Sequence, residues 1–299
     1  MSNTIRGVHA AVLSPLAADG TVDAAMLAAH CRWLLTSGCD GVTLFGTTGE
    51  GPSFSVAERK RVLKAVLTAG VPSAQVSVGT GCAAIADTIE LTHHAAGLGC
   101  AGALVLPPFF FKDIGDDGVH ASFAALFATL ESARIPIYLY NIPSVSAVSF
   151  SLDAIERLVR EFPDRVAGIK DSTADWSYTE PLLSRFARRI SVLVGAEHHL
   201  AAALKAGGAG TICGVANIAP GLLRRVHSGA ADAHADVEIV VKQILSHSFV
   251  PAMKAIRARQ TGDRRWLAVR PPLVPIDHTV ADRLHRDIER RISPAEAAQ

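Results

Sequence analysis

The sequence predicts an α/β protein, a (β/α)8 TIM barrel with a C-terminal helical extension. Three observations lead to this fold. Short apolar runs recur at intervals of roughly 30 residues, each is followed by a segment of helical periodicity, and there are eight such pairs. Eight similar units favour a closed barrel over a doubly wound open sheet. GTGCAA at 79–84 has the spacing of a dinucleotide-binding loop, but no acidic residue follows at the expected distance of about 20 residues.

The strands are expected at β-rich runs in this order: GVHAAVLSP near Gly7, GVTLFG near Gly41, QVSVGTG near Gln75, GALVLPP near Gly102, IPIYLYN near Ile135, VAGIKDS near Val166, ISVLVGA near Ile190 and AGTICGV near Ala209. Several intervening helices carry their own signals. Ser55 and Glu58 have the spacing of a capping box. Gly38, Gly70 and Gly97 stand where helix C-caps belong.

The pattern changes after the eighth strand. Residues 231–250, 252–260 and 276–292 are helix-like, and the helical pattern is broken at Gly262, Pro271, Pro272 and Pro275. Nothing before this region resembles a flexible linker. We therefore expect two parts: a barrel over residues 1–225 that carries the active site, and a helical region over residues 226–299 that packs on it.

Composition narrows the possible partners. The chain has 299 residues, a net charge of +1, 49% hydrophobic residues and 19% charged residues, which is typical of a soluble globular protein without a nucleic-acid partner. No apolar run reaches the ~20 residues that span a bilayer, and the first residues show no apolar leader. Five cysteines without a CxxC pair indicate a reducing compartment and buried thiols. We expect a cytoplasmic protein with no membrane partner.

Reactive groups of a barrel lie at the C-terminal ends of its strands, and few polar residues stand there. Lys170 is the central one, because the apolar strand before it carries its amine into the barrel mouth. A buried ammonium is costly, and the neutral amine is the form that adds to a ketone to give an imine. The alternative is an ion pair between Lys170 and an acidic residue at the rim.

Two further groups lie at strand ends. Gly46, Thr47 and Thr48 offer backbone N–H groups and hydroxyls that suit a carboxylate, although such loops are also ordinary turns. Tyr140 carries a phenol able to shuttle a proton, or simply packs. The adjacent pairs His93-His94 and His198-His199 diverge too far to share a metal, so we expect no metal.

Three motifs, GTTGE at 46–50, YNIPS at 140–144 and GIKDS at 168–172, resemble the N-acetylneuraminate lyase and dihydrodipicolinate synthase superfamily of class I, pyruvate-dependent aldolases. The resemblance covers nearly the whole chain. It implies a homotetramer built from two tight dimers and no cofactor. It also implies that Lys170 forms a Schiff base with pyruvate, that Thr47 and Thr48 hold the pyruvate carboxylate, and that Tyr140 is the general acid/base, with Thr47 passing the proton along.

The departures from this pattern concern the substrate. Dihydrodipicolinate synthases resemble one another in a second tyrosine after strand four and an arginine after the YN-x-P motif. Phe109 or Phe110 and Val145 stand at the corresponding positions here. Loss of the arginine removes a charge-assisted contact worth about 1.5–3 kcal/mol. Residues 51–59 also lack the histidines of lysine-regulated members. The distal pocket is expected to contain Ser144, Ser146, Glu197, His198 and Cys213, which suit the hydroxyls of a sugar acid, and Gly195 is a further expected substrate-binding residue.

The sequence therefore predicts a Schiff-base lyase that forms or cleaves a carbon–carbon bond with pyruvate as donor or product, on a 2-keto-3-deoxy sugar acid or a similar 2-keto acid. Three alternatives stay open: 4-hydroxy-tetrahydrodipicolinate synthase, a 2-keto-3-deoxy sugar acid dehydratase that uses the same imine, and a catalytically silent keto-acid sensor.

Overall fold

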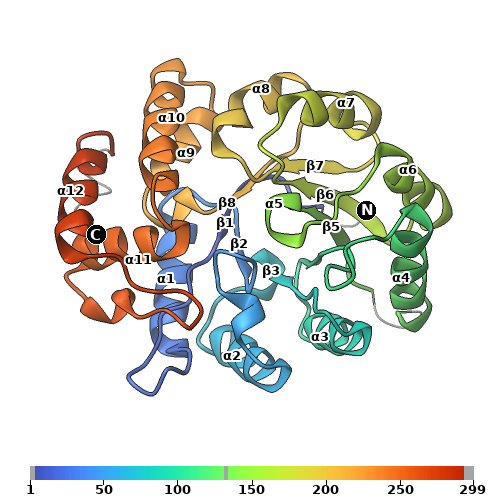
Figure 1. Ribbon diagram of the computed structural model, residues 1–299, viewed down its shortest axis with the longest axis horizontal. Helices are drawn as coiled ribbons and strands as arrows, with labels where there is room; N and C mark the ends of the chain where they lie inside the picture. Colours follow the sequence, from blue (N-terminus) through green and yellow to red (C-terminus); the bar gives the residue numbers. More distant parts are fainter. Residues whose placement is uncertain (1–3, 131–133, 293–299) are drawn as a thin grey trace. The chain divides into compact units, whose positions relative to one another are not determined.

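The computed structural model describes residues 4–130 and 134–292. Its eight strands follow one another in sequence order as a closed parallel barrel (Figure 1). They are β1 (Gly7–Ala11), β2 (Gly41–Leu44), β3 (Val76–Gly79), β4 (Gly102–Val105), β5 (Ile137–Asn141), β6 (Val166–Asp171), β7 (Ser191–Val194) and β8 (Gly210–Cys213). Each strand begins within two residues of its expected start. The predicted (β/α)8 barrel is therefore confirmed.

The helices are α1 (Ala24–Thr36), α2 (Val56–Thr68), α3 (Ile85–Gly97), α4 (Asp116–Thr129), α5 (Pro143–Ser146), α6 (Leu152–Glu161), α7 (Trp176–Phe186), α8 (Leu200–Lys205), α9 (Pro220–His227), α10 (Ala231–Leu245), α11 (Phe249–Thr261) and α12 (His278–Glu289). Gly38 and Gly70, with φ of 128° and 91°, confirm two expected C-caps. The third was wrong. Gly97 lies inside α3, and Gly99, with φ of 71°, takes the left-handed position after it.

The capping box of α2 is only half formed. The Ser55 hydroxyl accepts a hydrogen bond from the Glu58 N–H at 3.2 Å, as the sequence predicted. The Glu58 carboxylate does not return to Ser55. It accepts instead from the Arg270 guanidinium at 2.8 Å, because a buried charge gains more from an opposite charge than from a neutral N–H.

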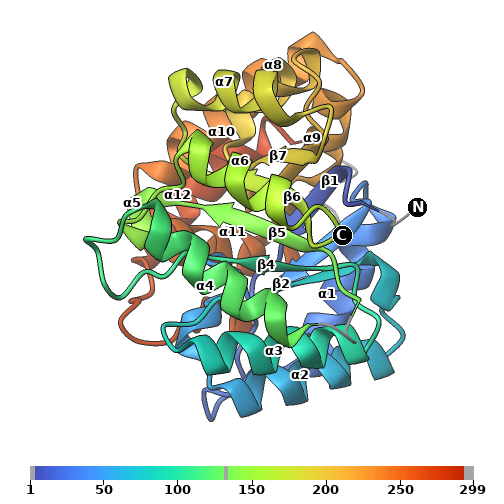
Figure 2. The same cartoon turned by 90° about the vertical axis from the view of Figure 1, so that its right-hand side faces the viewer.

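The chain divides into two compact units, which are described separately. The first contains Met1–Gly7 and Pro72–Ile212. In it α3, α4 and α6 pack side by side along the outside of the sheet (Figure 2). The strand register pairs Tyr138 with Gly168 and Tyr140 with Lys170. A Cβ atom at Gly168 would lie 2.7 Å from the Tyr138 ring, so this glycine makes room for the tyrosine.

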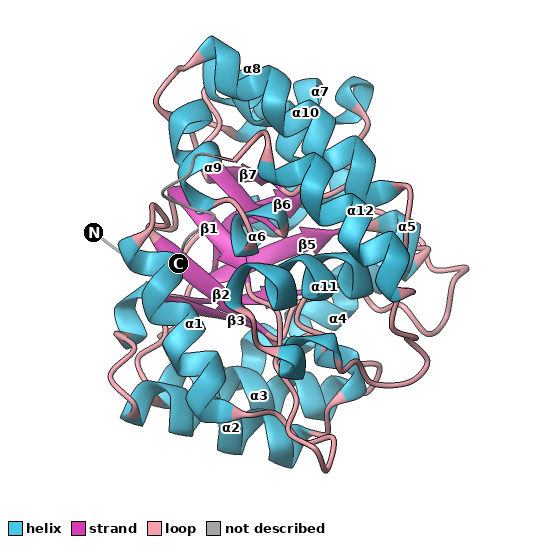
Figure 3. Cartoon of the chain, turned by 90° about the vertical axis from the view of Figure 1, so that its left-hand side faces the viewer, coloured by secondary structure: helices cyan, strands magenta, loops and turns pink. Residues whose placement is uncertain are grey.

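The second unit contains Val8–Val71 and Cys213–Gln299, and its helices α10, α11 and α12 pack against one another (Figure 3). The expected helical region after the eighth strand is present. The helix expected over 231–250 was too long, because residues 246–248 turn and Ser248 precedes α11 as its N-cap residue. Gly262, with φ of 69°, ends α11 as expected. The expected boundary after residue 225 lies inside α9, and the two-part division stays a prediction.

A buried ion pair fastens the C-terminal helices of the second unit to the loop after β2. Lys254 of α11 donates to the Glu50 carboxylate, and the side chains of both residues are fully buried. The other Glu50 oxygen accepts from the Arg270 backbone N–H at 2.8 Å. Burial lowers the pKa of Lys254, and the carboxylate opposes that shift. The GTTGE motif thus ends in a structural anchor.

Replacing Lys254 with methionine is expected to lower the free energy of unfolding by about 3–5 kcal/mol, because the Glu50 carboxylate stays buried without its counter-charge. Urea denaturation measures this change. The matched control is Arg291→Gln, which breaks the partly exposed pair with Asp236 and should cost less than about 1 kcal/mol. Equal losses in the two variants would contradict the anchor.

Candidate active site

Lys170 and Tyr140 lie beside each other on adjacent strands of the first unit. Strand register brings them to the same level, and the Lys170 Nζ donates to the Tyr140 hydroxyl at 3.2 Å. The same nitrogen lies 4.3 Å from the centroid of the tyrosine ring. Lys170 is 5% exposed and Tyr140 is 3% exposed. An amine and a phenol are therefore held together, away from bulk water.

Asp171, the acidic residue next to Lys170 in sequence, is occupied elsewhere. Its carboxylate accepts hydrogen bonds from Asn141 Nδ2 at 3.2 Å, from Thr173 Oγ1 at 3.0 Å and from Thr179 Oγ1 at 2.7 Å. Adjacent strand residues point to opposite faces, which separates this carboxylate from the amine. Within the described residues Lys170 forms no ion pair. The alternative of a rim ion pair is therefore not found.

The second tyrosine of β5 has a different environment. The Tyr138 hydroxyl accepts a hydrogen bond from the Ile5 backbone N–H at 2.6 Å, and burial raises the pKa of Tyr138 to about 12. Its phenol is thus tied to the N-terminal segment. Of the two tyrosines on this strand, Tyr140 is the one that contacts the amine.

Gly195, directly after β7, gives Lys170 its space. Its N–H donates to the Asp171 carbonyl at 2.6 Å, which holds the backbone close to β6. A Cβ atom at Gly195 would overlap the Ser172 hydroxyl and lie 3.0 Å from Lys170 Cε. A larger residue at this position would therefore displace the lysine side chain.

Replacing Gly195 with alanine is expected to slow formation of a borohydride-trapped pyruvate adduct by about 10²-fold, because a shift of about 1 Å in a reacting group costs that much. Mass spectrometry of timed samples measures the rate. Gly115→Ala is the control, since open space surrounds that position and its φ of −81° suits alanine. Unchanged adduct formation in Gly195→Ala would show that the lysine tolerates displacement.

The loop after β2, in the second unit, is tightly wound. Phe45 and Glu50, at its two ends, have left-handed φ values of 57° and 55°, which are uncommon outside glycine. A Cβ atom at Gly49 would lie 2.7 Å from the Val12 carbonyl oxygen. Such backbone strain persists where surrounding contacts hold it, and here the Glu50 anchor does so.

The loop presents the threonines that the sequence singled out. Thr47 is half-buried, and its carbonyl accepts from the Glu50 N–H at 3.1 Å. The buried Thr48 makes no hydrogen bond to another described residue, so its hydroxyl is available to a ligand. The Gly46 carbonyl accepts from the Gly51 N–H at 3.1 Å and closes the turn.

The other predicted pocket residues differ in the burial and the hydrogen bonding of their side chains. Ser144 is exposed in α5, whereas the Ser146 hydroxyl donates to the Val148 carbonyl at 2.7 Å and so holds its own turn. Glu197, which follows β7, and Cys213, at the end of β8, are both buried. His198 is half-buried beside His199.

The two predicted pocket phenylalanines after β4 differ in exposure. Phe109 is half-buried, while Phe110 is 69% exposed. Lys112 joins this loop to α5, because its Nζ donates to the Phe109 carbonyl and, at 3.2 Å, to the Ser146 carbonyl. No hydroxyl or guanidinium is present at Phe109, Phe110 or Val145.

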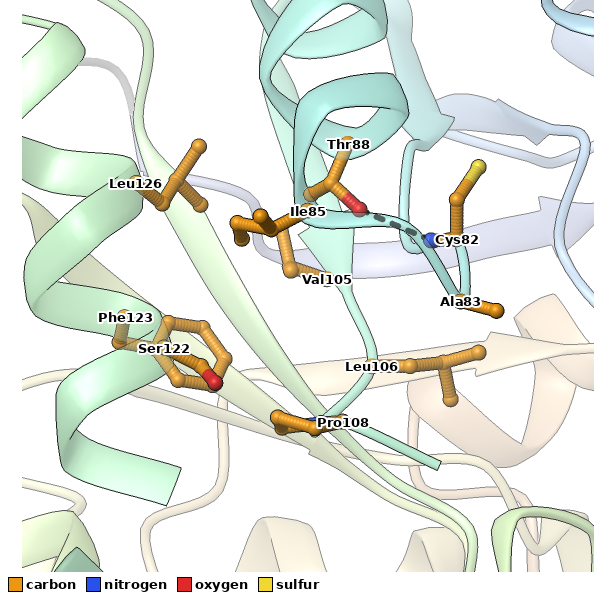
Figure 4. A pocket seen from close by; sticks show the side chains of 10 residues that line it. All are labelled: Cys82, Ala83, Ile85, Thr88, Val105, Leu106, Pro108, Ser122, Phe123 and Leu126. Carbon is orange, nitrogen blue, oxygen red and sulfur yellow. Dashed lines mark hydrogen bonds between the residues drawn. The ribbon is translucent and has the colours of Figure 1, made fainter. Parts of the chain in front are cut away.

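A small hollow lies between α3 and α4 in the first unit (Figure 4). Val105, Leu106 and Phe123 supply apolar side chains to its lining, and the N–H of Cys82 donates to the Thr88 hydroxyl at 2.9 Å beside it. All five cysteines are free. The expectation of buried thiols is wrong for Cys82, which is only partly buried in an irregular loop, and is confirmed for Cys31, Cys39, Cys100 and Cys213.

Two absences concern cofactors and membranes. Among residues 4–130 and 134–292, no three His, Cys, Asp or Glu side chains gather closely enough to hold a metal ion. Over the same part of the chain, no helix combines the length and the apolar character that crossing a bilayer requires.

Sequence reasoning missed the residues that support the site. Thr179 was not predicted to contact Asp171. The two residues are eight apart in sequence, across the turn from strand to helix, and this short separation could have suggested the contact. Lys254 is the one charged residue in the apolar segment FVPAMKAI at 249–256, and a single charge in such a segment indicates a buried charged side chain. Its partner could not be read from the sequence, because Glu50 is 204 residues away.

Comparison with known proteins covers nearly the whole chain. The model of the dihydrodipicolinate synthetase family matches residues 4–291. An uncharacterized DapA-like lyase of Chloroflexus aurantiacus is 36% identical over 292 residues, which are 95% of this chain and 96% of that protein. The crystal structure of dihydrodipicolinate synthase from Agrobacterium tumefaciens superposes with a TM-score of 0.91 at 36% identity, covering 97% and 100% of the two chains.

Two more distant structures extend the comparison. N-acetylneuraminate lyase of Proteus mirabilis is 26% identical, with a TM-score of 0.84 and coverage of 97% and 99%. Dihydrodipicolinate synthase of Acinetobacter baumannii, complexed with pyruvate, is 25% identical, with a TM-score of 0.85 and coverage of 96% and 99%. With the barrel and its site, these similarities define an enzyme of the lyase class. The chain belongs to the dihydrodipicolinate synthetase family, and the resemblance drawn from the three motifs is confirmed.

Proposed function

We propose that Lys170 is the Schiff-base residue of a pyruvate-dependent aldolase. The observation that carries the proposal is the buried Lys170 amine, which lies 3.2 Å from the Tyr140 hydroxyl and has no carboxylate partner among the described residues. An amine in this setting is held for addition to a carbonyl instead of being neutralised by an ion pair.

The chemistry follows from the imine. Lys170 Nζ adds to the keto carbon, the Tyr140 hydroxyl gives its proton to the departing water, and the iminium withdraws electrons from the C3–C4 bond. In the cleavage direction the C4 hydroxyl gives its proton to the Tyr140 phenolate, the C3–C4 bond breaks, an aldehyde leaves, and the electron pair of the bond forms the enamine of pyruvate. Tyr140 then protonates C3, and hydrolysis of the iminium releases pyruvate, restores the amine and returns a proton to Tyr140.

The glycine–threonine loop supplies the binding contacts in this proposal. Gly46, Thr47 and Thr48 hold the pyruvate carboxylate, and the family resemblance assigns Thr47 to pass the proton along. Two observations support this proposal. The Thr48 hydroxyl makes no hydrogen bond to another described residue, and the tight loop that contains it has left-handed φ values at Phe45 and Glu50. Gly195 serves the site by leaving space for Lys170.

For the substrate we propose a 2-keto-3-deoxy sugar acid or a similar 2-keto acid. Polar groups near the ends of strands five, seven and eight, at Ser144, Glu197 and Cys213, suit hydroxyl groups. Synthase activity on aspartate semialdehyde is disfavoured, because Val145 stands where the synthases resemble one another in an arginine.

We also propose that the protein acts in the cytoplasm as a homotetramer without a cofactor. Five free cysteines fit a reducing compartment. Phe110, Phe111 and Val145 are exposed by 69%, 74% and 58% in the first unit, and exposed apolar side chains of this size fit an interface between subunits. Sedimentation equilibrium tests the tetramer.

Reductive trapping tests the proposed function. The protein is incubated with pyruvate and sodium borohydride, and peptide mapping locates the mass increase. An adduct confined to Lys170 supports the proposal, and no adduct with pyruvate or longer 2-keto acids overturns it in favour of a silent sensor. A screen of sugar acids then separates the reactions, since an aldolase releases pyruvate whereas a dehydratase removes water with the carbon chain intact.

A further inference from the structure

A cleft of about 480 Å³ lies in the second unit, and none of the predicted site residues lines it. Its walls are α1, α11 and the 3-10 turn Arg264–Leu267 (Figure 3 shows the two helices). Met26 and Ala29 of α1 line one side, and Trp33, Trp266 and Arg257 line the rest. The volume falls within the range of small-molecule sites, roughly 300–1,000 Å³.

Arg257 is an unusual group to find at the base of such a cleft. Its guanidinium lies 3.7 Å from the centroid of the Trp33 ring, and the residue is only 3% exposed. Nη1 donates to Gln260 Oε1 at 3.3 Å, and Nε is covered without a partner in the described residues. Nη2 donates to no described residue and keeps some accessible surface, and Arg257 lines the cleft.

The carboxylates that line the cleft do not neutralise Arg257. Arg265 pairs with Asp23 at 3.0 Å and with Asp263 at 2.6 Å. Burial lowers the pKa of Arg257 to about 10, which still leaves the guanidinium charged at neutral pH. Buried guanidinium groups are normally paired with an anion, and the described residues provide none here.

His30, on the same wall, contributes no second charge. The Asn217 amide nitrogen donates to the Ala11 and Gly214 carbonyls, so its oxygen accepts from His30 Nε2 at 3.0 Å. Burial lowers the pKa of His30 to about 3, and the ring is neutral. The ring packs edge-on against Trp266 at 4.8 Å and stacks on Trp33 at 5.5 Å. The wall is thus aromatic, with one buried positive charge.

We propose that this cleft binds a monocarboxylate with a flat apolar body, which pairs its carboxylate with Arg257 Nη2 and lays its body against Trp33 and Trp266. A planar guanidinium matches a carboxylate, and the two tryptophans match a flat ring. Asp23 and Asp263 at the same cleft repel a second negative charge, so dianions and phosphates bind less well.

The test uses the intrinsic fluorescence of the two cleft tryptophans. Trp176 is the third tryptophan of the chain, and a Trp176→Phe background leaves the signal to Trp33 and Trp266. Benzoate is the probe, and its neutral isostere benzamide is the ligand control. We expect saturable quenching by benzoate with a Kd of about 1 mM and at least about tenfold weaker binding of benzamide.

Three variants assign the signal to the cleft. Arg257→Met removes the charge, and Ala29→Leu fills the cleft from an exposed helical position; each is expected to weaken benzoate binding at least about tenfold. Arg259→Gln, on the same helix but paired with Asp282, is the matched control and should bind benzoate unchanged. If Arg257→Met does not fold, benzoate binding by Ala29→Leu and benzamide binding by the parent protein still test the proposal. Equal binding of benzamide, or benzoate binding unaffected by Ala29→Leu, would overturn the proposal.

Discussion

Replacing Lys170 with alanine is expected to abolish the reducible pyruvate adduct and to lower turnover by about 10³-fold or more. The reason is that the variant lacks the amine that opens the covalent route in the proposed mechanism. Exchange of the pyruvate methyl protons with deuterium in D₂O, followed by NMR, measures enamine formation without knowledge of the second substrate.

Two controls show whether Lys170→Ala is folded and whether loss of the adduct is specific to Lys170. Lys112→Ala removes another first-unit lysine, whose Nζ donates to the Phe109 and Ser146 carbonyls, and should leave the mapped Lys170 adduct in place. Near-UV circular dichroism checks that Lys170→Ala keeps its packing. Methyl exchange at the wild-type rate in Lys170→Ala would assign the chemistry to another amine.

Replacing Tyr140 with phenylalanine is expected to separate imine formation from proton transfer. The amine stays in place, so borohydride should still trap an adduct at Lys170. The exchange rate should fall by about 10²–10⁴-fold, because the hydroxyl 3.2 Å from Nζ no longer moves the proton. The ratio of trapped adduct to exchange rate is the decisive readout.

Tyr178→Phe is the matched control for Tyr140→Phe. Its hydroxyl donates to the Phe150 carbonyl at 2.8 Å, and burial raises the pKa of Tyr178 above its ordinary value. The loss of this bond should reduce stability by about 1 kcal/mol and leave exchange intact. If Tyr140→Phe exchanged protons as fast as Tyr178→Phe, the proposed general acid/base role would be wrong.

Local patterns determined the barrel. Alternation of β-rich and helix-period segments is a property of neighbouring residues, so the starts of all eight strands could be placed to within two residues from the sequence. Helix ends were less well predicted. Gly97 and Gly99 both offer a C-cap, and the ending of α10 before residue 246 depends on Ser248 starting the next helix.

The sequence by itself also determined the family and the position of Lys170 on the sixth strand, because three short motifs and a strand period are local features. Only the tertiary structure decided which groups surround that amine. Asp171 is turned to Thr179, and Tyr140 is brought beside Lys170 by strand register. The Glu50–Lys254 pair joins residues far apart in the chain. Such contacts depend on how distant side chains pack, and no local pattern encodes their geometry.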